Sequence, residues 1–349
     1  MSSNDPLPRV SVIMLAFGPE EYLHDAVAAV LASSGIEVEL ILVDNGAATD
    51  SLARVPVDDR ITVLTPDRNL GFTGGVNLGA ARARYATLAL VNSDAIVEAT
   101  TLEALTRHLD DPGVGIAGAT IVLADSPELI NSAGNPLHVL GLSWAGGMNR
   151  PSASITQVRE VASASGACLA IRRELWESLG GFPEEFFAYV EDMELSWRCW
   201  QRGLRVEVLP QARALHHYEF SRSPLKMYLV ERNRLLLLAT VHERRTLAWL
   251  SVPVLGFELA ILLVAVAQGW GRQKISGWRW IATHRRWIRE RRRFVQASRS
   301  VPDADLMHLI TDTFDPAQTP LPPAAAPLES VLRAYWRSAR RSLSRKASA

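Results

Sequence analysis

The sequence predicts an α/β protein with a parallel sheet and a helical C-terminal extension. Apolar stretches rich in strand formers alternate with segments of helical periodicity, which is typical of strand–helix–strand units with right-handed crossovers. Two of these stretches, which begin at Glu37 and Leu88, run into polar residues. Because ligands bind beyond the carboxyl ends of strands in open α/β sheets, the pattern indicates a nucleotide-binding half-sheet.

The composition is ordinary for a globular protein, but the charge is unevenly distributed. The 349 residues include 37 Lys and Arg and 37 Asp and Glu, which gives a formal net charge of zero. Carboxylates are frequent up to about Glu219, whereas the segment from Arg222 to Arg299 is strongly basic. Cys168 and Cys199 lack metal-ligand spacing, so we expect reduced packing residues in a cytosolic compartment. We expect no cleavable signal sequence at the N-terminus.

The first part of the chain contains the elements of the half-sheet. Strands are expected at Val10–Phe17, Glu37–Asp44 and Ile61–Thr65, and helices at Glu20–Val30 and Val76–Ala83. A glycine-rich turn, Arg68–Asn77, would let the backbone approach a ligand closely. The turn has neither the Walker A nor the G-x-G-x-x-G pattern, which disfavours a P-loop kinase or a dehydrogenase.

The stretch Leu88–Val97 is expected to contain a buried strand that ends at Asn92-Ser93-Asp94. A carboxylate at this place can hold a divalent metal against the phosphates of a substrate. Taken alone, the same residues also fit a strand followed by an Asx turn.

A second acidic motif lies further along the chain. Before it we expect a helix at roughly Thr101–Leu109, a strand at Gly115–Leu123, a loop at Gly134–Ala153, a strand at Gly166–Ile171 and a short helix at Arg173–Leu179. An amphipathic helix then begins at Glu191-Asp192, where acidic side chains suit the helix dipole. These residues fit either acids placed for helix stability or a carboxylate held ionised, ready to accept a proton.

Two adjacent histidines follow the last strands. Short strands are expected at Val206–Leu209 and Ala212–Leu215, and the second leads into His216 and His217. Neighbouring residues of a strand point to opposite faces, so at most one of the two histidines faces a given site.

The most hydrophobic stretch of the chain, Leu247–Trp270, is long enough to span a bilayer. Glu258 interrupts it, and a glutamate within a membrane is costly. A helix or broken hairpin in the membrane interface, with basic flanks on anionic headgroups, fits this pattern best. A true span and a buried helix of a soluble fold are the alternatives. The apolar run disfavours nucleic acid as the partner of the arginines that follow it.

We expect three consecutive parts: an α/β domain over 1–222, a helical membrane-associating region over 223–300, and a C-terminal segment over 301–349. The second part is expected to open with a helix at Lys226–Val241. The third is expected to be a Pro/Ala-rich linker followed by a basic helix, Leu328–Leu343.

An ordered set of motifs between Arg9 and Leu238 resembles the inverting glycosyltransferases of family 2, which have the GT-A fold. The set reads S-V-I-M-L-A-F-G in the first strand, L-V-D-N-G at Asp44, R-N-L-G-F-x-G-G-x-N from Arg68, N-S-D at Asp94, S-G-A-C from Ser165, F-F-x-Y-x-E-D-x-E-L-x-W-R from Phe186, and H-H-Y-E-F-S-R-S followed by E-R-N-R. The order of these motifs is specific, although each alone is weak. The chain is most similar to the rhamnosyltransferase-like bacterial enzymes that build cell-envelope polysaccharides.

The resemblance implies a donor site at the strand ends and an acceptor-binding half beside it. Ala16, Phe17 and Glu20 would line the nucleoside pocket, Asp44 would hydrogen-bond the base, Arg68, Asn69 and Gly75 would enclose the nucleotide and donor sugar, Asn92 and Ser93 would contact substrate, and Arg222 would bind phosphate. Asp192 would be the general base that takes the proton from the acceptor hydroxyl, with Glu191 beside it binding substrate hydroxyls.

The resemblance also implies a metal. Asp94 matches the metal-binding carboxylate of the family's D-x-D motif, but Asn92 stands at the first position of that motif. A site with one carboxylate ligand would depend on the diphosphate, on water and on a histidine, for which His216 is the candidate and His217 the alternative. Mg²⁺ or Mn²⁺ would neutralise charge on the departing nucleoside diphosphate.

The predicted activity is the transfer of a sugar, with inversion, from a nucleotide-diphosphate sugar to a hydroxyl of a glycan acceptor. The donor would be a dTDP- or UDP-sugar, with dTDP-rhamnose as one candidate. The apolar and basic tail suggests a polyprenyl-linked acceptor at the cytoplasmic face of the membrane, and no nucleic-acid partner. One alternative is a catalytically degenerate membrane-bound scaffold, which Asn92 supports. The other is a nucleotidyltransferase, which the lack of a Gly-rich phosphate loop at Ala16–Glu20 disfavours.

Overall fold

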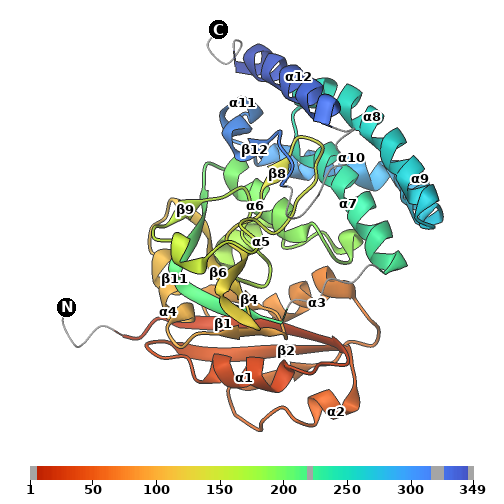
Figure 1. Cartoon of the computed structure of the whole chain (residues 1–349). Helices are drawn as coiled ribbons and strands as arrows, with labels where there is room; N and C mark the ends of the chain where they lie inside the picture. Colours follow the sequence, from red (N-terminus) through yellow and green to blue (C-terminus); the bar gives the residue numbers. More distant parts are fainter. Residues whose placement is uncertain (1–5, 218–222, 316–325, 345–349) are drawn as a thin grey trace. The chain divides into compact units, whose positions relative to one another are not determined.

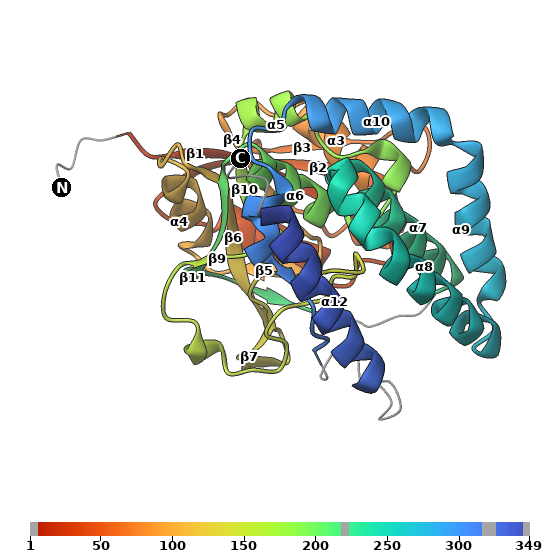
Figure 2. The same cartoon turned by 90° about the horizontal axis from the view of Figure 1, so that it is seen from above.

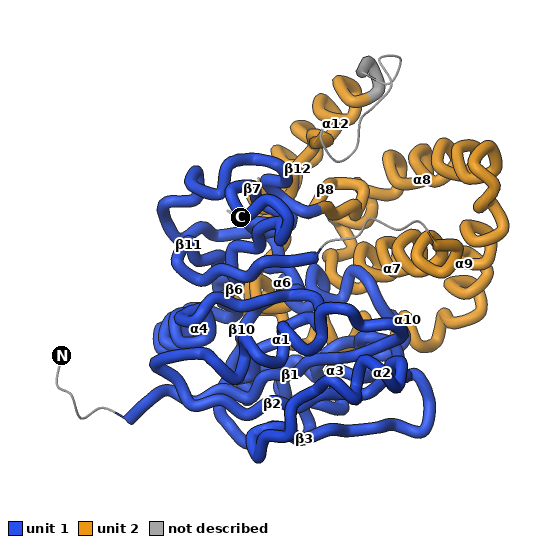
Figure 3. Tube along the Cα trace, turned by 60° about the horizontal axis from the view of Figure 1, so that its bottom comes forward, with its two compact units in different colours: residues 1–135, 145–196, 204–219 blue, residues 136–144, 197–203, 220–349 orange. Residues whose placement is uncertain are grey.

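The computed structural model describes residues 6–217, 223–315 and 326–344, and the chain forms two compact units (Figure 3). Unit 1 comprises residues 1–135, 145–196 and 204–219, and unit 2 comprises residues 136–144, 197–203 and 220–349. The two units therefore interleave along the sequence. The three consecutive domains expected from the sequence stay a prediction.

Unit 1 is built on a sheet of ten strands (Figure 1). The strands are β1 (Arg9–Gly18), β2 (Glu37–Ala47), β3 (Ile61–Leu64), β4 (Thr87–Val91), β5 (Ala95–Val97), β6 (Val114–Leu123), β7 (Ser126–Ser132), β9 (Arg159–Glu160), β10 (Cys168–Arg172) and β11 (Arg205–His216). The main order is β3-β2-β1-β4-β10-β6-β11-β5, with β7 on β6 and β9 on β11.

The first four strands of this order are parallel, as expected for a half-sheet, but the whole sheet is mixed. β10 runs antiparallel to both β4 and β6. Parallel pairing holds within the half-sheet and again between β6 and β11, whereas β10 interrupts it. The physical reason is that no crossover helix immediately precedes β10, so its direction is not imposed by a βαβ unit.

Two expected strand assignments differ from the structure. The stretch Leu88–Val97 divides at Asn92 into β4 and β5, and β5 leaves β4 to pair with β11, with Ala95 opposite His216. The two short strands expected near residues 206–215 are one strand, β11, whose register shifts between Leu209 and Arg213. Pro210 lies in this interval, and a proline lacks the N–H that an unbroken ladder needs.

The two faces of the sheet are covered by different helices. α1 (Leu23–Leu31) and α4 (Thr101–His108) share an apolar core with alternate β1 residues such as Val12 and Met14. α3 (Gly71–Ala80) lies on the opposite face (Figure 1). The remaining short elements of unit 1 are α2 (Thr49–Leu52), η1 (Ser152–Ser154), α5 (Arg173–Leu179) and η2 (Glu184–Phe186), and α6 (Glu191–Gln201) contributes its residues up to Ser196 to this unit.

The glycine-rich stretch expected as a turn is the first part of helix α3. A Cβ atom at Gly75 would lie 2.0 Å from Leu15 Cδ1, and one at Gly79 would lie 2.6 Å from Ile13 Cγ2. The glycines therefore let the helix pack closely against β1. This packing outweighs the low helix propensity that led us to expect a helix start at Val76.

Unit 2 is mainly helical (Figure 2). Its elements are α7 (Pro224–Val241), α8 (Arg244–Ala267), α9 (Gly271–Thr283), α10 (Arg285–Ala297), α11 (Asp303–Leu306), η3 (Met307–Leu309), α12 (Ala326–Ser344) and the short parallel pair β8 (Leu137–His138) and β12 (Ile310–Thr311). The Ser223 side chain caps α7 by accepting from Lys226 N, and Pro224 follows at the first helical position. α8 is long and apolar enough to cross a membrane, by length and composition alone.

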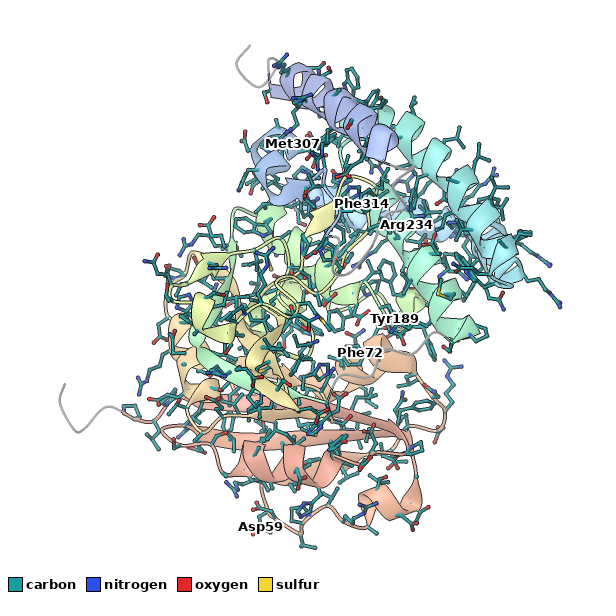
Figure 4. All side chains as sticks on the ribbon, viewed as in Figure 1. Asp59, Phe72, Tyr189, Arg234, Met307 and Phe314 are labelled. Carbon is teal, nitrogen blue, oxygen red and sulfur yellow. The ribbon has the colours of Figure 1, made fainter. Side chains whose placement is uncertain are left out.

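Four charged side chains of unit 2 form a buried charge cluster: Glu231 and Arg234 of α7, Glu258 of α8 and Lys274 of α9. Arg234 contacts both glutamates, and Lys274 Nζ lies 2.5 Å from Glu231 Oε2 and 2.8 Å from Glu258 Oε1. Trp278 Nε1 also donates to Glu258 Oε2 at 2.5 Å. Arg234 is labelled in Figure 4. The glutamate that interrupts the apolar run is thus neutralised by protein groups.

Candidate functional site

The end of β4 brings Asp94 against the end of β11. Asp94 Oδ1 lies 3.2 Å from His216 Nε2, and the backbone N–H of His217 donates to the Asp94 carbonyl at 3.0 Å. The Asp94 side chain is 36% exposed, whereas that of His216 is only 11% exposed. The structure therefore brings together the two residues expected as metal ligands, with one oxygen and one nitrogen at an accessible edge.

Asn131 of β7 determines which nitrogen of His216 carries a proton. Asn131 Oδ1 lies 3.0 Å from His216 Nδ1, and a carbonyl oxygen can only accept, so Nδ1 donates. In a neutral imidazole this leaves a lone pair on Nε2, directed at the Asp94 carboxylate. Such a contact becomes favourable when His216 is protonated or when both side chains bind one cation.

Glu20 lies beside the same edge. Its Oε1 accepts from Phe17 N at 2.8 Å, and its backbone N–H donates to Ser51 Oγ at 3.0 Å. Burial raises the pKa of Glu20, against hydrogen bonds from Phe17 and Ser93, and the nearby Asp94 raises it further. Glu20 therefore hydrogen-bonds Ser93 and lies near enough to Asp94 for the two carboxylates to repel each other.

The ring of His217 stacks on Tyr22, with ring centroids 3.5 Å apart and planes 8° apart. The two histidines therefore have different contacts. His216 contacts Asp94, and His217 packs on Tyr22 in the segment that follows β1. The metal role stays a prediction for His216, with His217 the less favoured alternative.

The end of β2 is held by an amide network that includes Asn69. Asn45 Nδ2 donates to Asn69 Oδ1 at 2.9 Å, and Leu70 N donates to Asn45 Oδ1 at 2.8 Å. Asp44 Oδ1 accepts from the backbone of Gly46 and Ala47, which forms a local turn. Asp44 and Asn69 thus have structural roles that are compatible with base contact through their remaining atoms.

The other residues expected at the donor site lie in varied surroundings. Phe17 is 55% exposed and Arg68 is also exposed, so both side chains are accessible. Ala16 is fully buried in the apolar core, backbone included. Gly75 packs against Leu15, and a Cβ atom added at Gly75 would clash with that side chain. Arg222 lies outside the described residues.

Asp192 lies at the first turn of α6 and receives several N–H donors. Gly166 N donates to Asp192 Oδ2 at 3.2 Å, Asn135 Nδ2 lies 3.5 Å from the same oxygen, and Met193 N donates to Oδ1 at 2.7 Å. Burial nevertheless raises the pKa of Asp192 above its ordinary value. We expected the helix start to keep this carboxylate ionised. The N–H donors do lower its pKa, but burial raises the pKa by more.

Glu191 is a buried acid next to Asp192. It is 8% exposed, and within the described part of the chain its Oε2 has no hydrogen-bond partner. Burial, followed by the charge of Asp192, raises the pKa of Glu191. At neutral pH the pair therefore favours a single negative charge, carried by Asp192, which has the donors.

The backbone just before this pair is strained. Phe187, Tyr189 and Val190 have positive φ angles of 64°, 71° and 73°, which β-branched Val190 in particular tolerates poorly. Thr73 N, on α3, donates to Phe187 O at 3.1 Å and helps to hold the segment. Figure 4 labels Tyr189 of this segment and Phe72 of α3. Strain of this kind is concentrated at functional sites.

Backbone contacts connect the two acidic motifs. Asn92 N, at the end of β4, donates to Ala167 O at 3.0 Å, and the neighbouring Gly166 donates to Asp192. The Asn92–Asp94 segment and Asp192 are therefore joined through Gly166–Ala167 at the carboxyl end of β4. Together they form one candidate active site within unit 1.

Sequence reasoning missed the supporting amides Asn45, Asn131 and Asn135, and the aromatic ring of Tyr22. Ser132 Oγ donates to Asn135 Oδ1 at 2.8 Å and thereby turns the Asn135 amide nitrogen toward Asp192. Asparagines near strand ends resemble ordinary turn residues, so no local signal distinguishes them.

Protein side chains alone do not complete a metal site here. Over residues 6–217, 223–315 and 326–344, no group of three or more His, Cys, Asp or Glu side chains is placed to hold a metal ion. The pair Asp94 and His216 fits an ion that takes its other ligands from diphosphate and water, since Mg²⁺ is bound in proteins by few side chains together with substrate phosphates.

Comparison with known proteins identifies the family. The profile of the family described as "Glycosyltransferase like family 2" matches residues 8–236. The O-antigen biosynthesis protein RfbC of Myxococcus xanthus is 30% identical over 227 residues, which cover 62% of this chain and 18% of that protein. The N-acetylglucosaminyl-diphospho-decaprenol L-rhamnosyltransferase of Mycobacterium tuberculosis is 27% identical over 240 residues, which cover 61% of this chain and 76% of that enzyme. The chain thus spans about a fifth of the first relative and about three quarters of the second.

Solved structures show the fold. The mannosyltransferase PcManGT from Pyrobaculum calidifontis, in complex with GDP-Man and Mn²⁺, matches with a TM-score of 0.50 at 16% identity over 83% of this chain and 86% of that chain. GalNAc-T7 with UDP, GalNAc and Mn²⁺ matches with a TM-score of 0.54 at 15% identity over 71% of this chain and 51% of that chain. The match of the family profile to residues 8–236, more than half of the chain, shows that the chain belongs to glycosyltransferase family 2, and the solved structures show the GT-A fold.

Proposed function

We propose that this enzyme transfers a sugar, with inversion at the anomeric carbon, from a nucleotide-diphosphate sugar to a hydroxyl of a glycan acceptor. The observation that carries the proposal is the environment of Asp192. Its contacts among the described residues come from N–H donors rather than from a cation, and it adjoins the strand end that carries Asp94. A partly exposed carboxylate in this setting is available as a base.

In the proposed reaction Asp192 accepts the proton of the acceptor hydroxyl while the acceptor oxygen attacks the anomeric carbon. The bond from that carbon to the diphosphate oxygen breaks, and the nucleoside diphosphate leaves with the bonding electrons. Glu191, protonated because it is buried beside Asp192, would donate a hydrogen bond to a substrate hydroxyl.

Asp94 and His216 would hold a divalent cation, Mg²⁺ or Mn²⁺. When bound, the ion would supply positive charge for the departing diphosphate. The support is the Nε2 lone pair of His216, which Asn131 directs at Asp94, and the partial exposure of that carboxylate. The solved structures of PcManGT and GalNAc-T7 contain Mn²⁺.

The nucleoside would lie over the ends of β1 and β2. The exposed ring of Phe17 would stack on the base. Glu20 and Asp44 would offer carboxylate oxygens to the nucleoside, and Asn69, held by Asn45, would contact it from the end of β2. Arg68, Gly75, Asn92, Ser93 and Arg222 complete the proposed set of donor contacts.

The name of the mycobacterial relative supports a lipid-linked acceptor and a rhamnosyl donor, and the exposed apolar helix α8 supports work at a membrane. We therefore propose a dTDP- or UDP-sugar donor, with dTDP-rhamnose the first to test. The acceptor would be a polyprenyl-linked glycan at the cytoplasmic face of the cell membrane, in cell-envelope polysaccharide synthesis.

Donor binding gives the direct test. We would measure saturation-transfer NMR and thermal shift of the full chain against UDP-, dTDP- and GDP-sugars, each with Mn²⁺ and with EDTA. We expect one donor class to bind in a metal-dependent manner, and Asp94→Ala and His216→Ala to lose the metal dependence. A matched control is His217→Phe, which keeps an aromatic ring for Tyr22 to stack on.

Metal-independent binding that survives Asp94→Ala would refute the proposed metal site. Failure of every donor to bind would favour a degenerate scaffold instead.

A further inference from the structure

Helix α8 of unit 2 buries a mixed side that includes Glu258 and exposes an apolar side. Five of its large apolar side chains are 57 to 73% exposed and recur every three or four residues, and we call them the apolar strip: Val252, Leu255, Leu259, Leu263 and Val266. This spacing places all five on one side of the helix. Leu250, Glu258 and Ala265 are buried on the other side.

An ordinary surface helix turns its apolar side inward, whereas α8 also exposes a strip of large apolar side chains. Neighbouring helices of unit 2 extend the exposed apolar surface. Ile275 of α9 is 54% exposed, and Val331 of α12 is 66% exposed. α12 lies along the first part of α8, where Tyr335 Oη donates to Trp249 O at 2.7 Å (Figure 1). Exposed apolar side chains gathered on one helix, rather than scattered singly, are typical of a site of association.

Length alone would allow α8 to span a membrane, since its 24 residues extend to about 36 Å. The buried charge cluster argues against a span. Glu258 binds Arg234 and Lys274, and Trp278 donates to its second oxygen. A spanning α8 would carry these helices, with a glutamate, an arginine and a lysine, into the hydrocarbon or separate Glu258 from its partners. Both are costly in a bilayer.

Basic side chains accompany the apolar strip. On α9, Arg272 and Arg279 share the exposed side of the helix with Ile275, at helical spacing. On α12, Arg337 and Arg341 are exposed opposite the buried Trp336 and Ala339 and, with Arg340, line a shallow hollow. An apolar strip with arginines on both neighbouring helices complements a surface of acyl chains and anionic headgroups.

We propose that α8 lies in the plane of an anionic phospholipid leaflet, with the apolar strip inserted and the arginines of α9 and α12 on the headgroups. α8 is then an interfacial helix rather than a transmembrane one, and its Glu258 side remains packed on α7 and α9. This proposal depends only on unit 2, so it stands or falls independently of the sugar-transfer proposal.

The first test is flotation of the full chain with vesicles of phosphatidylcholine that contain about one third phosphatidylglycerol. We expect binding that weakens with added salt and on pure phosphatidylcholine vesicles. Leu255→Asn and Leu259→Asn should each reduce the partition coefficient by about tenfold, because each removes an inserted leucine. Arg279→Gln should cause a smaller reduction, confined to the anionic vesicles.

The control is Val57→Asn, which replaces a more exposed apolar side chain of unit 1 and should not change vesicle binding. Because all these side chains are exposed, the variants should fold, and their thermal midpoints would be compared to verify this. Absence of vesicle binding by the native chain would overturn the proposal. So would self-association without lipid that the strip variants abolish, because the strip would then be an interface between copies.

A second test separates an interfacial helix from a span. Arg244→Cys and Ala267→Cys place thiols at the two ends of α8, and the native Cys168 and Cys199 are buried. A membrane-impermeant maleimide applied to everted membrane vesicles should label both ends, and applied to intact spheroplasts it should label neither. Labelling of the two ends from opposite sides would overturn the proposal.

Discussion

The two units bury carboxylates in opposite ways. In unit 1, Glu191 and Asp192 lie together and the contacts of Asp192 are N–H groups, so burial raises the pKa of both acids. In unit 2, Arg234 and Lys274 overcome the effect of burial and hold the pKa of Glu231 below its ordinary value. The first arrangement keeps a proton exchangeable near neutral pH, whereas the second fixes charge permanently. A buried acid in this protein is therefore a candidate for chemistry where it lacks a cation, and a structural element where it has one.

The largest effect is expected at the acid without a cation. Asp192→Asn should reduce transfer by about 10²- to 10⁴-fold, because the amide cannot accept the acceptor's proton. The measurement is the initial rate of nucleoside diphosphate release with donor and acceptor present. Donor binding and the thermal midpoint serve as controls and should be preserved. Transfer at the native rate would show that Asp192 is not the base.

The matching change in unit 2 should affect stability. Arg234→Met leaves Glu231 and Glu258 with one cation, Lys274, and should lower the free energy of unfolding by about 3–5 kcal/mol. Urea denaturation measures this loss. The control is Arg286→Met, which removes the exposed ion pair with Glu290 and should leave the free energy of unfolding nearly unchanged. Equal losses in the two variants would contradict a structural role for the buried charge cluster.

The protonation of Glu191 gives a pH-dependent prediction. Since its pKa is raised on folding, the folded state holds a proton that the unfolded chain releases, and this contribution to stability is lost as pH rises above the ordinary glutamate value of 4.5. Glu191→Gln should remove this loss and raise the thermal midpoint at alkaline pH by a few degrees. Thermal melts across pH test this expectation, with the acid range as the internal reference.

The same variant should keep transfer within about threefold at neutral pH, because glutamine resembles the protonated acid. An unchanged pH profile of stability would show that Glu191 is ionised in the native protein.

The smallest effect is expected for Asn135→Ala. Its amide lies 3.5 Å from Asp192, a long contact, so its loss should reduce transfer near neutral pH by about two- to fivefold. The acid limb of the rate profile should move to higher pH, because Asp192 loses a donor that lowers its pKa. Ser132→Ala removes the hydrogen bond that orients the Asn135 amide, and it should move the acid limb in the same direction by a smaller amount. A uniform loss of rate at all pH values would indicate a purely structural role.

The sequence predicted the local parts of this molecule well. Long apolar runs located β1, β2 and β4, and the crossover rule gave their parallel order. The pairing of Asp94 with His216 was expected only from the family resemblance, and the structure brings the two residues together although β4 and β11 are not adjacent in the sheet. The direction of β10 was not predicted, because a strand carries no local signal of its orientation.

Long-range partners also escaped prediction. From the sequence, we treated Glu258 as an interruption of an apolar run. Its partners lie on other helices, with Arg234 of α7 24 residues before it and Lys274 of α9 16 residues after it. Asn131 of β7 contacts His216, and Asn135, which follows the end of β7, contacts Asp192, so both depend on where β7 lies in the fold. The start of α3 was missed because glycines have low helix propensity, and contact with β1 outweighs that propensity.

The partners of Glu258 have a consequence for the synthesis of this protein. Lys274 and Trp278 follow it by 16 and 20 residues, so α8 leaves the ribosome before its glutamate can be neutralised by them. Arg234 precedes Glu258 by 24 residues and is the cation available to it at that stage, so the buried charge cluster is completed only when α9 has been made. For the same reason, a shortened protein that ends between α8 and α9 should be degraded or aggregate, and expression trials should place the terminus beyond Trp278.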